Sequence, residues 1–412
     1  MEPSTLFNIL ITILLIKFVI DSVLNHLNAK HFNDTLPNDV SDVYEINEYL
    51  KSQTYKRTNH NFSKITSLFS LITTLLFFFF NGFSIVDEIA RGFSNNIIII
   101  TLIFFGIIIV GSDIISIPFS LYKTFIIEEK FGFNKVTKKI FFLDKIKGLL
   151  MTIILGGSIL SIITWFYEFT GNYFWIYSWL LISAFSIFLN MFYSKLIVPL
   201  FNKQTILEEG DLKNDIIKYV NSVGFKAQDI YVLNGSKRST KANAYFSGFG
   251  NQKRITLYDT LINDLENDEI VAVLAHEVGH YKRKHILYNL TLSIILTGFA
   301  LFVLSLFIKT PVLSLALGVS LPSFHIGLIA FGILYSPVSQ ILGIFMNYMS
   351  RKFEYQADNY AKNTFSASPL ISSLKKLSKN SLSNLTPHYL YVFFHFSHPT
   401  LLERIKNLKK IN

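Results

Sequence analysis

The sequence predicts a mainly α-helical, polytopic membrane protein with a small α+β subdomain. Three observations predict this class. The 412 residues are 50% hydrophobic and only 16% charged, which is more apolar surface than a soluble domain of this size needs. Seven apolar stretches are long enough to cross a bilayer. Residues 208–262 are more polar and have the pattern of a helix and short strands instead.

The predicted spans lie at about residues 5–24, 65–84, 96–117, 149–167, 173–193, 287–307 and 325–348. The distribution of Lys and Arg tests this division independently, because short cytosolic segments carry an excess of positive charge. The segments after spans one, three, five and seven hold 5, 7, 13 and 10 such residues, whereas those after spans two, four and six hold 1, 0 and 1. The alternation predicts an N-terminus outside and a C-terminus in the cytosol.

The chain divides into two expected domains. Residues 1–205 form an N-terminal membrane domain of five spans and a basic interfacial loop, and residues 206–412 include spans six and seven. The net charge of +10 comes largely from segments between apolar runs, so we expect membrane lipids and no nucleic acid as partners. Asp21 and Asp113 lie near the ends of spans one and three. They are either functional intramembrane acids or hydrated groups at an interface, and the pattern leaves both readings open.

The polar segment 208–262 is expected to form the small subdomain. Asp211–Val223 has helical periodicity, and three β-rich runs follow at Asp229–Leu233, Asn243–Gly248 and Arg254–Tyr258. We expect them to form an antiparallel sheet. Its edge strand would either pair with an extended substrate peptide or serve only as a structural hairpin, and the pattern favours neither.

His276, Glu277 and His280 form a His-Glu-x-x-His pattern that follows an apolar run over residues 270–275. On a helix this spacing puts both imidazoles on one face, where they can share a metal ion. Glu277 lies beside that metal position, where a carboxylate can take a proton from an activated water. No break signal stands between about Asp268 and span six, so we expect one continuous helix and a site at the membrane surface.

A catalytic zinc needs three protein ligands and an open position for water. The chain has no cysteine, so the third ligand must be His, Asp or Glu. After span seven, Glu354 and Asp358 lie four residues apart on one face of an expected helix. Glu354 would complete a His, His, Glu set, and Asp358 would hydrogen-bond a ligand histidine or the substrate. A charged helix that leaves the membrane fits the pattern equally well.

The segment Ser397-His398-Pro399 lies near the C-terminus. The proline holds His398 in an extended backbone. This histidine would either stabilise the oxyanion of a tetrahedral intermediate or have a structural role only. Ser397 or Thr400 is placed to cap the final amphipathic helix.

Together these segments resemble the integral-membrane zinc endopeptidases of the type I CAAX prenyl protease family. The segments that carry the resemblance are Thr124–Asn134, Asn243–Gly250, Lys253–Leu261, His276–His280, Glu354–Asp358 and Ser397–Pro399. The resemblance covers nearly the whole chain. It implies a barrel of about seven transmembrane helices around a water-filled chamber, closed on the cytosolic side by a zincin-type catalytic subdomain. Two positions depart from the family pattern, because Thr400 replaces a second proline and Lys241 stands where relatives often carry histidine.

The resemblance also implies a role for each candidate site residue. Glu277 would be the general base, and Asp358 would be an acid beside the metal ligands that is often described as a proton donor. His398 and Arg404 would line the site near the developing oxyanion. The implied ligands of one Zn²⁺ per chain are His276, His280 and Glu354. The implied substrate-binding edge is Asn243, Ala244, Tyr245 and Phe246.

The expected function is therefore hydrolysis of peptide bonds at or near the cytosolic membrane surface. The substrates would be peptides or proteins, by resemblance C-terminal CAAX-type peptides that carry a prenyl group. The chain is compact, which suits a bacterial relative in the inner (cytoplasmic) membrane, whereas a eukaryotic member would lie in the endoplasmic reticulum membrane. The alternative is a quality-control protease or a client-binding chamber protein without prenyl specificity. A secondary transporter would need inverted repeats, and we see none in the sequence.

Overall fold

A computed structural model gives the structure of the chain and describes residues 1–225, 229–248 and 254–410. Phe249, Gly250 and Lys253 of the segments quoted above lie outside this part. The helices are α1 (Pro3–Lys30), α2 (Ile46–Phe79), α3 (Gly82–Phe93), α4 (Ile97–Tyr122), α5 (Lys138–Met151), α6 (Gly157–Phe169), α7 (Phe174–Phe192), α8 (Val198–Phe201), α9 (Asp211–Ser222), α10 (Asp259–Asp264), α11 (Asn267–Lys282), α12 (His285–Phe307), α13 (Pro311–Leu315), α14 (Phe324–Thr364), α15 (Ala367–Asn380), α16 (Tyr389–His395) and α17 (Leu401–Lys409). The strands are β1 (Gln204–Ile206), β2 (Ile230–Leu233), β3 (Ala244–Ser247) and β4 (Arg254–Tyr258).

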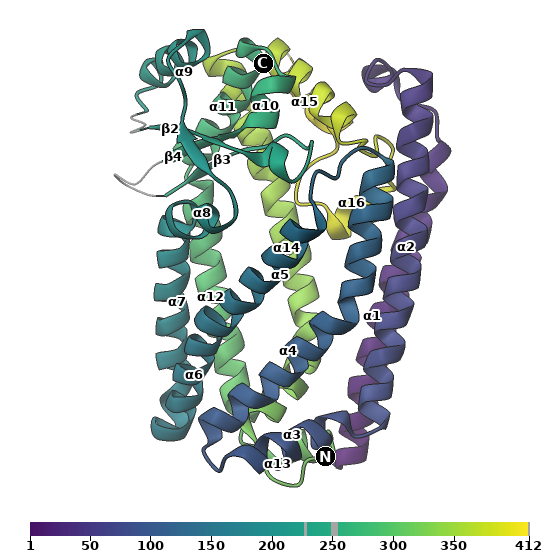
Figure 1. Cartoon of the computed structure of the whole chain (residues 1–412), viewed down its shortest axis with the longest axis vertical. Coiled ribbons are helices and arrows are strands. Elements are labelled where there is room, and N and C mark those ends of the chain that lie inside the picture. The colour runs from purple at the N-terminus through teal and green to yellow at the C-terminus, as the bar shows by residue number, and fades with distance from the viewer. Residues whose placement is uncertain (226–228, 249–253, 411–412) are drawn as a thin grey trace.

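Seven helical stretches within the described residues are long and apolar enough to cross a membrane, which confirms the predicted count. They are Pro3–Lys30, Ile46–Phe79, Ile97–Glu128, Lys138–Phe169, Gly171–Phe201, His285–Phe307 and Phe324–Thr364. The predicted second span extends too far, because α2 ends at Phe79 and the left-handed Asn81 turns the chain into α3. The two ends of the chain lie at opposite ends of the molecule (Figure 1), as an odd number of crossings requires.

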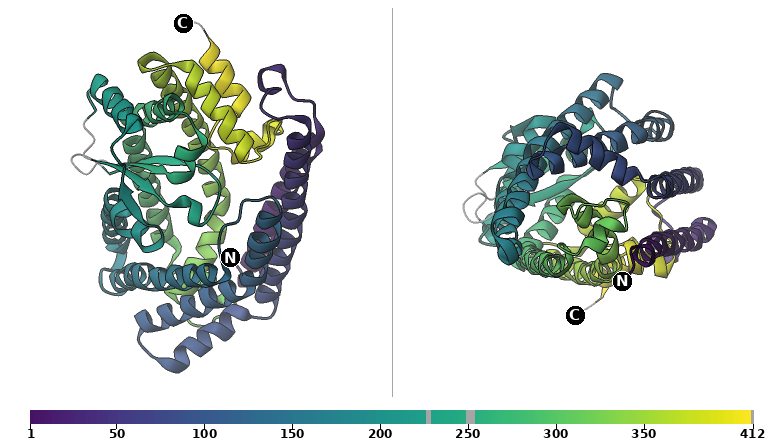
Figure 2. Two further views of the ribbon diagram at one scale, coloured as in Figure 1. Left: turned by 45° about the horizontal axis from the view of Figure 1, so that its top comes forward. Right: turned by 90° about the horizontal axis from the view of Figure 1, so that it is seen from below.

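The spans stand in a ring rather than in a packed bundle (Figure 2, right). α1 packs on α2, α2 contacts the Lys123–Glu128 end of the third span, α4 packs on α6, α6 on α7 and α7 on α12, and α14 lies between α12 and α1. At most 17% of the most apolar window of each span is buried inside the protein. Such low burial is expected when a helix packs mainly on its neighbours in a ring.

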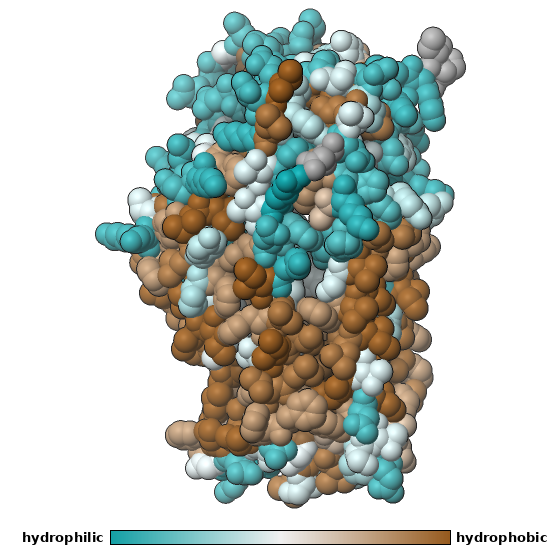
Figure 3. Space-filling view, turned by 90° about the vertical axis from the view of Figure 1, so that its right-hand side faces the viewer, coloured by the Kyte–Doolittle hydropathy of each residue, from teal (hydrophilic) through white to brown (hydrophobic). Residues whose placement is uncertain are grey.

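Hydropathy divides the molecule along its long axis. On the face drawn in Figure 3, an apolar belt separates a hydrophilic head from a narrower hydrophilic rim at the opposite end. In Figure 1 the head contains the sheet with α9, α11, α15 and the C-terminus, and the rim contains α3 and α13. An apolar belt between two polar ends is the surface that a bilayer requires.

The sheet in the head has four strands in the order β1-β2-β4-β3. β3 pairs antiparallel with β4, as expected, but β2 pairs parallel with β4, so the prediction of a purely antiparallel sheet is wrong. The connection of residues 234–243 is not a tight hairpin. It leaves a place for β4 between β2 and β3. β1, which was not predicted, pairs antiparallel with β2.

The helix that carries the two site histidines ends before the sixth span, so the prediction of one continuous helix is also wrong. α11 ends at Lys282, and α12 begins at His285. Lys284 between them has a left-handed backbone with φ of 59°. A lysine rarely adopts this conformation, so nothing in the local sequence signals the break.

The core of the head surrounds α11. Ile270, Leu274 and Val278 are fully buried, and they pack with the sheet residues Ile255 and Leu257. The opposite face of α11 lies against the C-terminal part of α14. This packing holds the two site histidines against the third predicted ligand.

Candidate metal centre

α11 presents its histidines from a helix with a well-defined start. Glu266 and Glu269 form a capping box, in which each carboxylate accepts a hydrogen bond from the backbone N–H of the other residue. The helix then continues unbroken through His276 and His280, so the two imidazoles lie one turn apart on the face toward α14.

α14 supplies the third group because it continues beyond its apolar part into the head. Its last turns bury Phe353, Glu354, Ala357 and Asp358 against α11. The two carboxylates lie four residues apart and therefore share one face.

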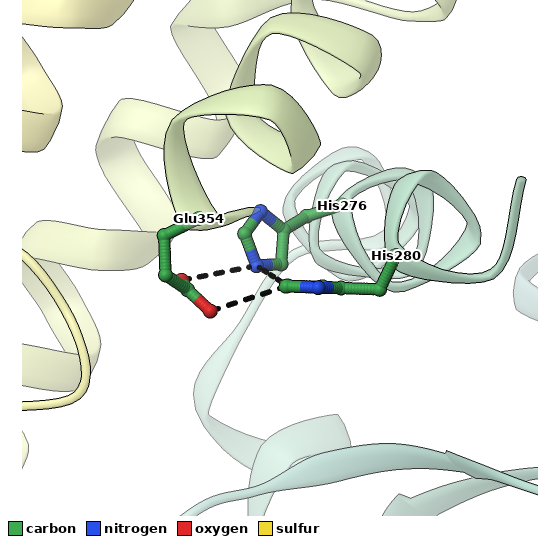
Figure 4. Close-up of side chains that lie close together, drawn as sticks. All are labelled: His276, His280 and Glu354. Carbon is green, nitrogen blue, oxygen red and sulfur yellow. Dashed lines mark hydrogen bonds and ion pairs between the residues drawn. The ribbon is translucent and has the colours of Figure 1, made fainter. Parts of the chain in front are cut away.

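The three predicted ligand residues converge (Figure 4). The Nε2 atoms of His276 and His280 are 3.1 Å apart. The Glu354 carboxylate lies 3.4 Å from His276 Nε2 through Oε2 and 3.2 Å from His280 Nε2 through Oε1. Tetrahedral zinc with bonds of about 2.0–2.2 Å places its ligand atoms about 3.3 Å apart. The spacing therefore matches that of a zinc site.

The chemistry of this donor set also fits a cation. Glu354 Oε2 is buried and has no hydrogen-bond partner within the described residues. Burial and the charge of Arg404 lower the pKa of His276, but its interactions with the carboxylates of Asp358 and Glu354 outweigh them and raise it to about 9. Two imidazoles and a buried carboxylate are the ligand set of many catalytic metal sites.

Asp358 and Arg404 contact the predicted ligand residues from the buried side of the site. Asp358 Oδ1 lies 2.9 Å from His276 Nδ1, the nitrogen that faces away from Glu354. Arg404 on α17 holds the same carboxylate with two hydrogen bonds, from Nε at 2.9 Å and from Nη2 at 2.6 Å. Its Nη1 is 3.5 Å from Glu354 Oε2. Asp358 is fully buried, so in this structure it contacts the predicted ligand His276 and not the open side of the site.

Glu277 is partly buried next to the ligands. Its pKa is raised, first because burial disfavours the charged carboxylate and also because of the nearby charge of Glu354, although His276 and His280 act in the opposite direction. A carboxylate with a raised pKa is suited to accept a proton and to release it again near neutral pH.

His398 lies on the open side of the same carboxylate. Its side chain is 62% exposed, and its Nε2 is 3.4 Å from Glu354 Oε1. Ser397 Oγ is 2.9 Å from the other ring nitrogen. Thr400 caps α17 by a capping box with Glu403, which confirms one of the two predicted caps. The structure thus brings His398 to the site from the chain's C-terminal part.

Within the described residues, the predicted substrate-binding residues lie at the free edge of the sheet, because β3 is the last strand in the order. The N–H of Tyr258 donates to the carbonyl of Asn243 at 3.0 Å. In antiparallel pairing the direction alternates, so the outward backbone groups belong to Ala244 and Phe246. The outward N–H of Ala244 already donates to the Asn243 side-chain oxygen at 2.9 Å. A cavity of about 440 Å³ borders the side chains of Tyr245 and Phe246.

The loop before β3 is held by the segment 124–134. Asn134 bridges to Ser239, and the N–H of Thr240 donates to the carbonyl of Phe133 at 3.3 Å. Lys241 lies 3.4 Å from Glu128 Oε2 and 4.4 Å above the ring of Phe133. This segment, expected only to be an interfacial loop, therefore anchors the candidate substrate strand to the membrane domain.

The two intramembrane acids do not join this site. Asp113 lies 3.9 Å from Lys145 and is partly exposed. Asp21 borders a cavity of about 460 Å³ together with Lys17.

Sequence reasoning missed two residues beside the ligands, His285 and Gln356. His285 Nδ1 is 3.0 Å from His280 Nδ1, and His285 Nε2 is 2.8 Å from Gln356 Oε1. Gln356 stands between Glu354 and Asp358 in the sequence, and this position was the only available signal. For His285 no signal existed, because its position depends on the break at Lys284.

Comparisons with known proteins agree with this architecture. Residues 25–203 match the family described as CAAX prenyl protease N-terminal, five membrane helices, and residues 207–412 match peptidase family M48. The CAAX prenyl protease 1 homolog of Dictyostelium discoideum is 36% identical over 416 residues, which are 98% of this chain and 97% of the relative. CAAX prenyl protease 1 of Saccharomyces cerevisiae is 32% identical over 425 residues, 96% of this chain and 93% of the relative.

A solved structure shares the whole fold. The crystal structure of S. mikatae Ste24p superimposes with a TM-score of 0.94 at 31% identity, and the match covers 98% of this chain and 99% of that one. The relatives named here are eukaryotic, so they lend no support to the prediction of a bacterial source. Matches of this length and identity decide the family. The chain belongs to the M48 peptidases that carry the CAAX prenyl protease N-terminal domain, and it is a multi-pass membrane metallopeptidase.

Proposed function

We propose that this peptidase is a zinc endopeptidase that cleaves CAAX-type peptides whose C-terminal cysteine carries a prenyl group. The convergence of His276, His280 and Glu354 around one point, with Glu277 beside them, carries the zinc assignment. One Zn²⁺ per chain would be held by these three side chains. The names of the relatives support the substrate class.

Zinc bound at this site would polarise the carbonyl group of the scissile peptide bond and lower the pKa of a water. The chain's own residues then move the protons. Glu277 takes the proton of the attacking water, and its raised pKa allows it to pass that proton to the leaving amine. His398 is placed on the open side of Glu354, where an N–H can donate to the developing oxyanion.

Asp358 and Arg404 hold the ligands rather than touch the substrate in this proposal. Asp358 accepts the Nδ1–H of His276, which leaves the Nε2 lone pair for the metal. Arg404 neutralises this buried carboxylate with two hydrogen bonds and reaches Glu354 as well. The assignment of Asp358 as a direct proton donor receives no support from its buried position behind His276.

The substrate backbone would add to the free edge of β3. The carbonyl of Ala244 and both backbone groups of Phe246 point outward, so an extended peptide gains hydrogen bonds along two residues. The side chain of Asn243 shapes this edge by occupying the N–H of Ala244. The cavity beside Tyr245 and Phe246 would take a substrate side chain.

The zinc site would face the cytosol, as the alternation of Lys and Arg indicates. The eukaryotic relatives support the endoplasmic reticulum membrane over the bacterial inner membrane. The division into residues 1–205 and 206–412 is part of the proposal and is supported by the two family matches, which meet between 203 and 207.

Matched peptides with and without a farnesylated cysteine test the substrate class. Both would be presented to the purified protein in liposomes, with Glu277→Gln and a chelator as controls. Glu277-dependent cleavage of only the lipidated peptide supports the proposal. Cleavage of both peptides would show a quality-control protease without prenyl specificity. Cleavage of neither, with zinc bound, would favour a client-binding chamber protein.

A further inference from the structure

His280, the second histidine proposed to bind the metal, is contacted by a further histidine. His285, the first residue of α12, places its Nδ1 3.0 Å from Nδ1 of His280. On its other side, His285 Nε2 is 2.8 Å from Gln356 Oε1. The three side chains therefore form a chain from the metal centre to α14, and neither His285 nor Gln356 has a role in the mechanism above.

The backbone is shaped to permit this contact. In an unbroken helix a residue five positions after His280 would lie about 140° away around the axis and would face elsewhere. The left-handed Lys284 turns the chain instead, so that His285 faces back toward His280. His285 is 2% exposed, and its ring stacks on Phe353 at 4.3 Å with an interplanar angle of 12°. Its orientation is thus held by packing as well.

The donor and acceptor of each hydrogen bond follow from Gln356, the last of the three residues. An amide oxygen only accepts, so His285 carries its proton on Nε2 and donates it to Gln356 Oε1. A neutral His285 then has a lone pair on Nδ1 and accepts the Nδ1–H of His280. With its proton on Nδ1, His280 has its Nε2 lone pair directed at Glu354 and the metal position.

We propose that His285 and Gln356 are positioning residues that fix the tautomer and the ring plane of the metal ligand His280. This inference rests on the proposed function, because it takes His280 as a zinc ligand. His276 is held by a charged carboxylate, Asp358, whereas His280 is held by a neutral pair. Both ligands are thereby presented with Nε2 toward the metal, while only one of them is hydrogen-bonded to a negative charge.

Zinc affinity measured by chelator competition tests the inference without relying on turnover. Gln356→Leu removes the acceptor and should weaken zinc binding roughly 10- to 100-fold, the usual effect of losing such a partner. Gln356→Glu keeps an acceptor for His285 Nε2–H and should restore affinity to near the wild-type value. Gln340→Leu, the same change elsewhere on α14, is the matched control. His285→Ala should resemble Gln356→Leu.

A second readout separates a positioning role from loss of structure. The visible spectrum of the Co²⁺-substituted protein reports the ligand field, so it should change in Gln356→Leu and remain unchanged in Gln340→Leu. Wild-type affinity and an unchanged spectrum in both Gln356→Leu and His285→Ala would overturn the inference. A wild-type protein that binds no zinc would overturn the proposed function instead, so the two failures are distinguishable.

Discussion

Gly279 of α11 lies directly against Ala357 of α14. A Cβ atom at Gly279 would stand 3.1 Å from both the Cα and the carbonyl oxygen of Ala357. This close approach occurs between His276 and His280 on one helix and between Glu354 and Asp358 on the other. The glycine in the segment His276-Glu277-Val278-Gly279-His280 is therefore the residue that lets the two helices with the proposed ligands meet.

Gly279→Ala should separate the helices. The backbone of Ala357 cannot give way as a flexible side chain would, so we expect a loss of about 1–3 kcal/mol of stability and a weaker metal site. Thermal unfolding in detergent and zinc content measure the two effects. Gly343→Ala on α14 is the control, because a Cβ there meets nothing within 4 Å. Equal stability of the two variants would contradict the explanation.

Glu277→Gln should abolish turnover and leave zinc bound. The amide cannot take a proton from water, and losing a general base costs roughly 10²- to 10⁴-fold in kcat. The three ligand side chains are unchanged, so zinc content should match the wild type. Steady-state kinetics and metal analysis on the same sample measure both. Full activity, or loss of zinc, would show that the role is assigned to the wrong residue.

Asp358→Asn should destabilise the protein and weaken zinc binding. The change removes the nearer of the two carboxylates that face the buried Arg404 guanidinium and leaves only Glu354, and breaking a buried ion pair costs up to about 3–5 kcal/mol. It also weakens the hydrogen bond to His276, for which a roughly 10- to 100-fold loss of metal affinity is expected. The double variant with Arg404→Gln should recover part of the stability. Additive losses would argue against direct coupling of the pair.

Glu269 should make stability depend on pH at the acid end. Its burial acts to raise its pKa, but hydrogen bonds from Lys376, Ser372 and the N–H of Glu266 outweigh this and hold the pKa below the ordinary 4.5. The stabilisation is therefore complete above about pH 4.5 and is lost as the pH falls toward the folded-state pKa.

Melting temperatures of the Glu269→Gln variant between pH 3 and pH 7 check this expectation. The variant should be less stable than the wild type at neutral pH, and the difference should shrink on acidification. The neighbouring Asp268→Asn is the control, because Asp268 is exposed. A difference that stays constant with pH would contradict the assigned cause.

Periodicity in the sequence was enough to predict the membrane part and the two histidines of the candidate metal site. Seven spans could be recognised because an apolar run long enough to cross a bilayer is a local property of the chain. His276 and His280 could be paired because four residues make one helical turn. Glu354 required the resemblance to a family, since no local pattern says that a helix after span seven meets α11.

Other features depend on contacts between distant segments, and only the tertiary structure decided them. The parallel pairing of β2 with β4 depends on the path of residues 234–243, which short turn signals do not determine. The break at Lys284 has no signature in its own sequence, because packing around His285 compensates for an unfavourable backbone conformation. Arg404 on α17 forms ion pairs with both Asp358 and Glu354 on α14, and these residues are far apart in the sequence. Local chemistry thus indicated the two histidines and Glu277 on one helix, and long-range packing decided which residues meet them and how they are held.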